Sequence, residues 1–149
     1  MKLQEFLAEL PELLRSQLPP DLQEFVVLGP RGSLIQFHFG DPHIHYEVWI
    51  QRRRQLLEVG LHFEGGQASN LRWLEALSTL WPALIPILGP ETELEQWTAS
   101  WTRVHQHIPL APLDEDFLLE VSTRMSRLMR ALQPLVEEGV EALEQPVTR

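Results

Sequence analysis

The chain has no cysteine and only one lysine, Lys2, among its 149 residues. The absence of cysteine excludes disulfides, thiol nucleophiles and thiolate metal sites. A P-loop and a Schiff-base enzyme each need a lysine at the reacting group, whereas Lys2 lies at the start of a predicted helix. The GxSxG, GxGxxG and HExxH motifs are also missing. These absences leave few routes to catalysis, and we expect a non-enzymatic protein without a cofactor.

Basic charge is scarce as well, since 12 basic residues face 21 acidic ones and the net charge is −9. Such a molecule repels a polyanion, so we expect no binding to nucleic acid. The sequence has no apolar run of membrane-spanning length and no leader with a small-residue cleavage site. We therefore expect a cytoplasmic protein with no membrane contact. Its length suits one domain, residues 1–149.

Helical periodicity of the apolar residues predicts helices over about 2–17, 70–88 and 114–144. The last helix would be about 45 Å long, which exceeds the width of so small a domain. A leucine-rich seam of this kind more often packs within its own chain, but the excess length leads us to expect a homodimer. The seam steps alternately by three and four along Leu118, Val121, Met125, Leu128, Leu132 and Leu135.

Period-two alternation predicts three antiparallel strands near residues 33–39, 43–50 and 56–64. Residues 91–108 fit a helix or strands, and we favour a strand or a hairpin that turns near Ala99. The expected fold class is α+β, in which a three-strand meander plus one or two further strands packs against helices and the C-terminal helix is long. One face of the meander is apolar and forms the core: Ile35, Phe37, Phe39, Ile44, Tyr46, Val48, Ile50, Leu57, Val59, Leu61 and Phe63.

The opposite face of the meander is polar, and its register decides which side chains meet. A tight turn at Asp41 and Pro42 places His38 opposite His45. If the loop at the arginines has four residues, His45 also faces His62. If that loop has two residues, Glu47 faces Glu58 instead. This polar face is expected to be solvated. Three residues near the end of the later strand are expected to be exposed as well, with a small-ligand pocket as the alternative: Arg103, His105 and His107.

A recognition surface is our main interpretation of the polar face. Trp49 is costly to leave in water and would act as an aromatic anchor for a partner. Three consecutive arginines form a charged hairpin tip, expected either to be only solvated or to touch an acidic partner. The full surface comprises Trp49, His45, Glu47, His38, His62, Arg52, Arg53 and Arg54. We expect no metal there, although imidazole and carboxylate are suitable donors for one; its ligands would be His38, His45, His62 and Glu47.

The predicted order of helix, three strands, helix, strand or hairpin and long helix resembles the small dimeric chaperones of type III secretion systems. It is also similar to restriction-endonuclease-like cores, in which Glu47 and Glu58 would be the candidate acids. The lysine expected two residues after the second acid is replaced by Gly60. This departure puts nuclease activity in doubt, and neither resemblance by itself establishes a function.

From these patterns we expect a non-enzymatic protein-binding or chaperone-like module that binds a protein partner or itself, as a homodimer. Two alternatives stay open. One is a metal-binding or hydrolytic protein that uses the His and Glu cluster on the outer sheet face. The other is a degenerate restriction-endonuclease-like domain.

Overall fold

The structure, a computed structural model, describes residues 1–145, so the last four residues of the predicted domain lie outside the described part. It contains six strands and four α-helices. The strands are β1 (Val26–Arg31), β2 (Leu34–His38), β3 (Ile44–Gln51), β4 (Leu56–Phe63), β5 (Glu93–Gln96) and β6 (Thr102–Pro109). The helices are α1 (Leu3–Gln17), α2 (Gln67–Leu88), α3 (Glu115–Glu138) and α4 (Val140–Glu144). The α+β prediction is confirmed.

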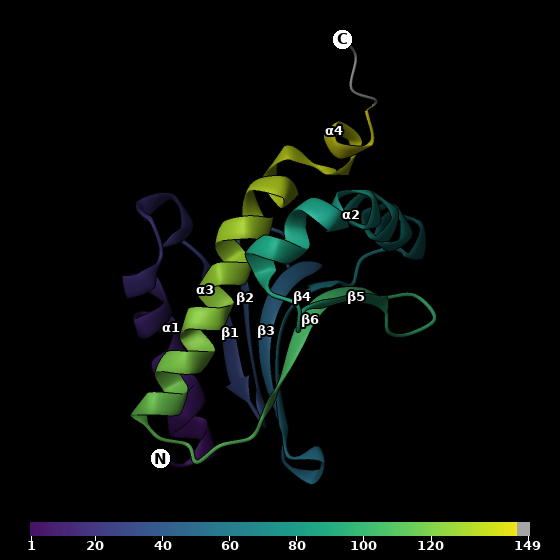
Figure 1. Ribbon diagram of the computed structural model, residues 1–149. Helices are drawn as coiled ribbons and strands as arrows, with labels where there is room; N and C mark the ends of the chain where they lie inside the picture. The colour runs from purple at the N-terminus through teal and green to yellow at the C-terminus, as the bar shows by residue number, and fades with distance from the viewer. Residues whose placement is uncertain (146–149) are drawn as a thin grey trace.

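All six strands form one antiparallel sheet in the order β1-β2-β3-β4-β6-β5. The helices pack on its apolar face, as Figure 1 shows, and the predicted apolar residues of the meander lie in this core. Phe6 of α1 stacks on Phe117 of α3, and Trp73 of α2 stacks on Phe63 of β4. We call the opposite, polar side of the sheet the outer face.

The observed register confirms the predicted row of histidines. His38 pairs with His45 across β2 and β3, and His45 pairs with His62 across β3 and β4. Gln51 pairs with Leu56, so the loop at the arginines has four residues and begins with a short 3-10 turn. The alternative pairing of Glu47 with Glu58 is therefore wrong.

The second half of the chain departs from prediction at two helix ends. Helix α2 begins at Gln67, three residues before the expected start. Asn70, where the helix was expected to begin, lies in its first turn, and the Asn70 side chain bonds the backbone of Gly65. Helix α3 ends at Glu138 rather than near Glu144, since the backbone turns at Gly139 with φ of 91°. The predicted hairpin within residues 91–108 is confirmed as β5 and β6.

The apolar seam of α3 lies in the protein's own core. Leu118, Val121, Met125, Leu128 and Leu132 are each at most 5% exposed, against the sheet and α1. Beyond α3 the chain continues as α4, which contacts α2 (Figure 1). The seam that motivated the expectation of a dimer is thus already used within one chain.

Candidate functional site

The centre of the outer face is buried, so the expectation of a solvated surface is wrong there. His62 and Glu58 are fully buried, and His45 and Glu47 are 4% and 5% exposed. The helices lie on the other face of the sheet, so these side chains cover one another instead. Buried polar groups must be paired to avoid a large desolvation cost.

Gly60 makes room for a close contact in this network. Glu58, Gly60 and His62 follow one another at every second position of β4, and therefore point to the same face. His62 Nε2 donates to Glu58 Oε2 at 2.5 Å, across the position where Gly60 lacks a side chain. A Cβ at that position would lie 2.8 Å from the Cβ of His105 and 3.2 Å from Glu58 Oε2. Gly60 thus allows an imidazole and a carboxylate to meet.

The electrostatic surroundings keep His62 protonated. Burial lowers the pKa of His62, but hydrogen bonds to Glu58 and Glu64 outweigh this and raise its pKa to about 9. Burial likewise raises the pKa of Glu58, but the His62 bond and the charge of Arg103 bring that pKa below its ordinary value. The pair is therefore an imidazolium and a carboxylate near neutral pH.

Strand β6 supplies the second cation of the network. Arg103 contacts Glu58 through one guanidinium nitrogen, and a second nitrogen lies 2.6 Å from Glu95 of β5. The side chains of Arg103 and His105 are 10% and 1% exposed, so the expectation that they are solvated is wrong. His105 Nε2 lies 2.9 Å from Glu95, yet neither ring nitrogen forms a well-aligned hydrogen bond with the described residues. Burial, reinforced by the positive charge of Arg103, lowers the pKa of His105 to about 4.

Trp97, just after β5, covers the open side of the network. Its ring meets His62 edge-on with a centroid distance of 5.4 Å, and the Arg103 guanidinium carbon lies 4.6 Å from the Trp97 ring centroid. These contacts help explain how a sheet face without a helix over it excludes water from an ion pair. A desolvated cation over an aromatic ring also gains stabilisation.

Four ligand atoms of the network lie within 4.8 Å of one another, on His45, Glu47, His62 and Glu64. Three of these residues were predicted as possible ligands, but Glu64 takes the place expected for His38. The ring of His38 instead accepts a bond from the backbone of Gly40.

Trp49 and the three arginines lie at the other end of β3, beside a hollow of about 580 Å³. Trp49 is partly buried and the arginines are exposed. Among residues 1–145, none of the three arginines forms an ion pair; Arg54 donates to the Gln51 side-chain oxygen at 3.0 Å. The Gln51 amide nitrogen is buried and has no hydrogen-bond partner in the described part of the chain. The lining residues are Leu3, Ser33, Trp49, Ile50, Gln51, Arg52, Arg53 and Arg54.

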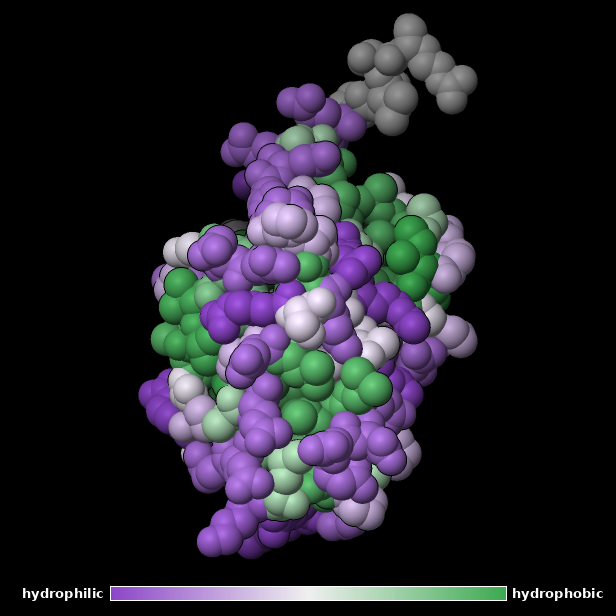
Figure 2. Space-filling view, turned by 90° about the vertical axis from the view of Figure 1, so that its left-hand side faces the viewer, coloured by the Kyte–Doolittle hydropathy of each residue, from purple (hydrophilic) through white to green (hydrophobic). Residues whose placement is uncertain are grey.

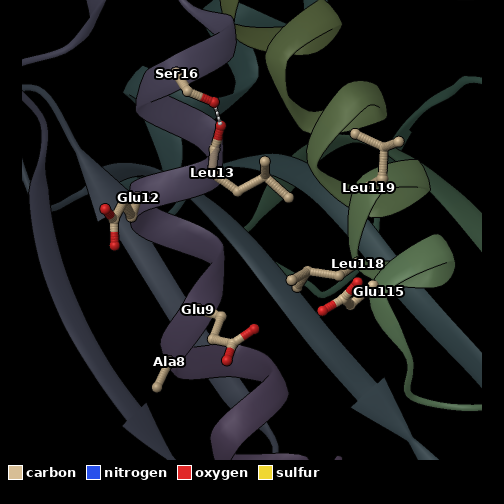
Figure 3. Close-up of a pocket in the computed structure, with 8 residues that line it drawn as sticks. All are labelled: Ala8, Glu9, Glu12, Leu13, Ser16, Glu115, Leu118 and Leu119. Atoms are coloured by element: carbon tan, nitrogen blue, oxygen red, sulfur yellow. Dashed lines mark hydrogen bonds between the residues drawn. The ribbon is translucent and has the colours of Figure 1, made fainter.

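A second hollow, of about 670 Å³, lies between α1 and α3 and has the opposite charge. Leu13 and Leu118 point into it between the two helices, as do the carboxylates of Glu9 and Glu115, whereas Glu12 points away from α3 (Figure 3). Figure 2, which views the molecule from its α1 side, shows apolar areas separated by hydrophilic ones. The net charge of −9 makes the molecule acidic on balance, and the arginine tip is a cluster of the opposite sign.

Sequence reasoning missed the roles of Arg103, Glu95 and Trp97, which lie far along the chain from His62. Alternation places Arg103 and His105 on one face of their strand, but it does not say which strand lies beside that one. Glu64, which the sequence places as a flanking residue of the predicted histidine row, directly follows the last residue of β4.

A scan of protein-family models finds no match to this chain, and a search of curated proteins finds no match either. Across residues 1–145, no helix has both the length and the apolar character that a bilayer crossing demands.

Proposed function

We propose that this protein is a non-enzymatic protein-binding module, and that its hairpin tip captures an acidic segment of a partner protein. The observation that carries the proposal is the hollow beside Trp49, surrounded by Arg52, Arg53 and Arg54. The partner segment would place carboxylates on the arginines and an apolar side chain in the hollow. The proposal includes the expected cytoplasmic location.

The arginines support this choice of partner because the described residues offer them no carboxylate. Guanidinium groups bind carboxylates with two parallel hydrogen bonds, which makes arginine common at such interfaces. The rest of the molecule is strongly acidic, with a net charge of −9. An acidic partner would thus be repelled by the molecule as a whole and drawn toward the basic tip.

The lining of the hollow beside Trp49 supports the proposal in two further ways, one apolar and one polar. Trp49 and Leu3 offer apolar surface, and tryptophan is enriched among residues that dominate binding energy. A buried donor without a partner costs free energy, so the amide nitrogen of Gln51 favours a ligand that brings an acceptor.

The test is fluorescence anisotropy with a labelled peptide of alternating glutamate and leucine, compared with its glutamine counterpart at two salt concentrations. We expect the acidic peptide to bind and the neutral one to bind at least tenfold more weakly. Salt should weaken the binding, because exposed charges are screened. Trp49→Ala should cost on the order of 2 kcal/mol of binding, as truncating an anchor does.

Arg127→Ser is the matched control, since Arg127 is an α3 residue that lines a different hollow. This variant should bind as the wild type does, whereas replacing Arg52, Arg53 and Arg54 by serine should abolish binding. Equal binding of both peptides, or full binding by the triple variant, would refute the proposal.

Self-association is part of the proposal, as a homodimer. The hollow between α1 and α3 is a poor surface for it, because two copies would bring the glutamates of Figure 3 together. A dimer must therefore use a surface other than this hollow and the buried seam of α3.

A further inference from the structure

We propose that the outer face holds a divalent transition-metal ion, with zinc as the first candidate, between His45, Glu47, His62 and Glu64. This site is separate from the hairpin tip. The four residues come from two neighbouring strands: His45 and Glu47 lie on β3, while His62 lies on β4 and Glu64 directly follows it. Two imidazoles and two carboxylates form a donor set that suits four-coordinate zinc.

The spacing of the donors supports the site. His45 Nε2 lies 3.0 Å from Glu47 Oε1 and 3.8 Å from Glu64 Oε2, and His62 Nδ1 lies 2.9 Å from Glu64 Oε2. Donors about 2.0–2.2 Å from a tetrahedral ion stand roughly 3.3 Å apart, close to these separations. The two rings are nearly parallel, with an interplanar angle of 13°, so both must tilt to aim at one ion.

Each histidine has its other ring nitrogen held by an acceptor outside the ligand set. His45 Nδ1 lies 2.9 Å from the carbonyl oxygen of Pro42, and His62 Nε2 donates to Glu58. Metal-binding histidines in proteins nearly always show this arrangement, because the outer acceptor fixes the tautomer and the ring direction. Arg103 in turn holds the Glu58 carboxylate in place.

Two other groups of possible metal ligands lie on the same face, and the positive charge of Arg103 disfavours a metal ion at either of them. One group is Glu58, His105 and His107, and the other is Glu93, Glu95 and His105. The Arg103 guanidinium contacts Glu58 and Glu95, and it cannot lose its proton to make way for a metal. By contrast, none of the four proposed ligands forms an ion pair with an arginine among residues 1–145.

The test begins with tag-free protein stripped by EDTA and titrated with zinc chloride by calorimetry. We expect one zinc ion per chain and a higher melting temperature with zinc. Glu64→Gln and His45→Gln should each weaken zinc binding at least tenfold. The matched controls are His43→Gln, a neighbouring exposed histidine, and Glu93→Gln, which belongs to a competing group; both should bind zinc as the wild type does.

A second measurement uses the wild-type protein, so it does not depend on the folding of variants. Zinc should shift the NMR signals of the His45 and His62 rings and leave those of His105 and His107 in place. The proposal is overturned if zinc does not bind, if binding persists in both ligand variants, or if only the His105 and His107 signals move. In those cases the network is an ion-pair cluster alone, and peptide binding at the hairpin tip is unaffected.

Discussion

The imidazole of His62 and the carboxylate of Glu58 meet at 2.5 Å, four residues apart on one strand. The Cα atoms of residues four apart on a strand are separated by about 13 Å. Both side chains must therefore lean toward each other over the residue that lies between them on the same face. That residue is Gly60, and its missing side chain is what allows the contact.

Gly60→Ala should therefore destabilise the fold by about 1–3 kcal/mol, the usual cost of forcing an extra methyl group into a packed site. The new Cβ would lie 2.8 Å from the His105 Cβ and 3.0 Å from the carbonyl oxygen of Val104. Urea unfolding monitored by circular dichroism measures the change. Gly65→Ala is the control, since its Cβ would meet atoms only at 3.7 Å. Equal stability of the two variants would contradict the proposed role of Gly60.

The stability of the metal-free protein should fall in alkali. The folded pKa of His62 is about 9, above the ordinary value of 6.5, so the ion pair is fully present below pH 6.5. Its contribution, up to about 3 kcal/mol, should be lost as the pH rises through 9. Urea unfolding in EDTA at several pH values checks this. Constant stability between pH 6.5 and 9.5 would show that His62 is neutral in the folded protein.

Stability should also fall in acid, because His105 stays neutral in the folded protein. Its folded pKa of about 4 is lower than the ordinary 6.5, so the unfolded chain binds a proton first as the pH drops. The loss should develop between pH 6.5 and 4, on the order of 2 kcal/mol after allowance for solvent screening. His105→Gln should lessen this loss, whereas His43→Gln, at an exposed site, should not. Thermal melts across this pH range distinguish the two variants.

The arginines of the hairpin tip and Arg103 should differ sharply in their effect on stability. Replacing Arg52, Arg53 and Arg54 together by serine should change the melting temperature by only about one or two degrees, as exposed substitutions usually do. Arg103→Ala should cost about 3–5 kcal/mol, because the buried Glu58 would keep His62 but lose the second of its two cations. Differential scanning fluorimetry ranks the variants. A large loss in the triple variant would mean that the tip packs against the domain.

The protein should be a dimer in solution, and light scattering at micromolar concentration measures its mass. Because the seam of α3 is buried, Ile87→Ser, at an exposed position of α2, serves as a probe of a second helical surface and should lower the measured mass if the dimer uses it. A monomer mass that does not change with concentration would rule the dimer out.

Local pattern was enough to predict the meander, its two faces and much of its pairing. Alternation with period two assigns each side chain to a face, and the short turn at Asp41 and Pro42 leaves one register for His38 and His45. The loop at the arginines could have two or four residues, and either length keeps the apolar side chains of the two strands on the same face. The pairing of His38 with His45 and the position of Trp49 therefore followed from the sequence, whereas the pairing of His45 with His62 followed from only one of the two loop lengths.

Burial of the polar face was decided by the tertiary structure alone. Strand β6 lies beside β4 although about 45 residues separate Arg103 from Glu58 along the chain, and nothing in the alternation of either strand specifies that neighbour. This pairing brings in Arg103, which with Glu95 and Trp97 turns a row expected to be wet into a closed network of charges. The seam of α3 shows the same limit, because its spacing is equally suited to a partner helix and to the protein's own sheet. Period describes which side chains share a face, but only long-range packing determines what covers that face.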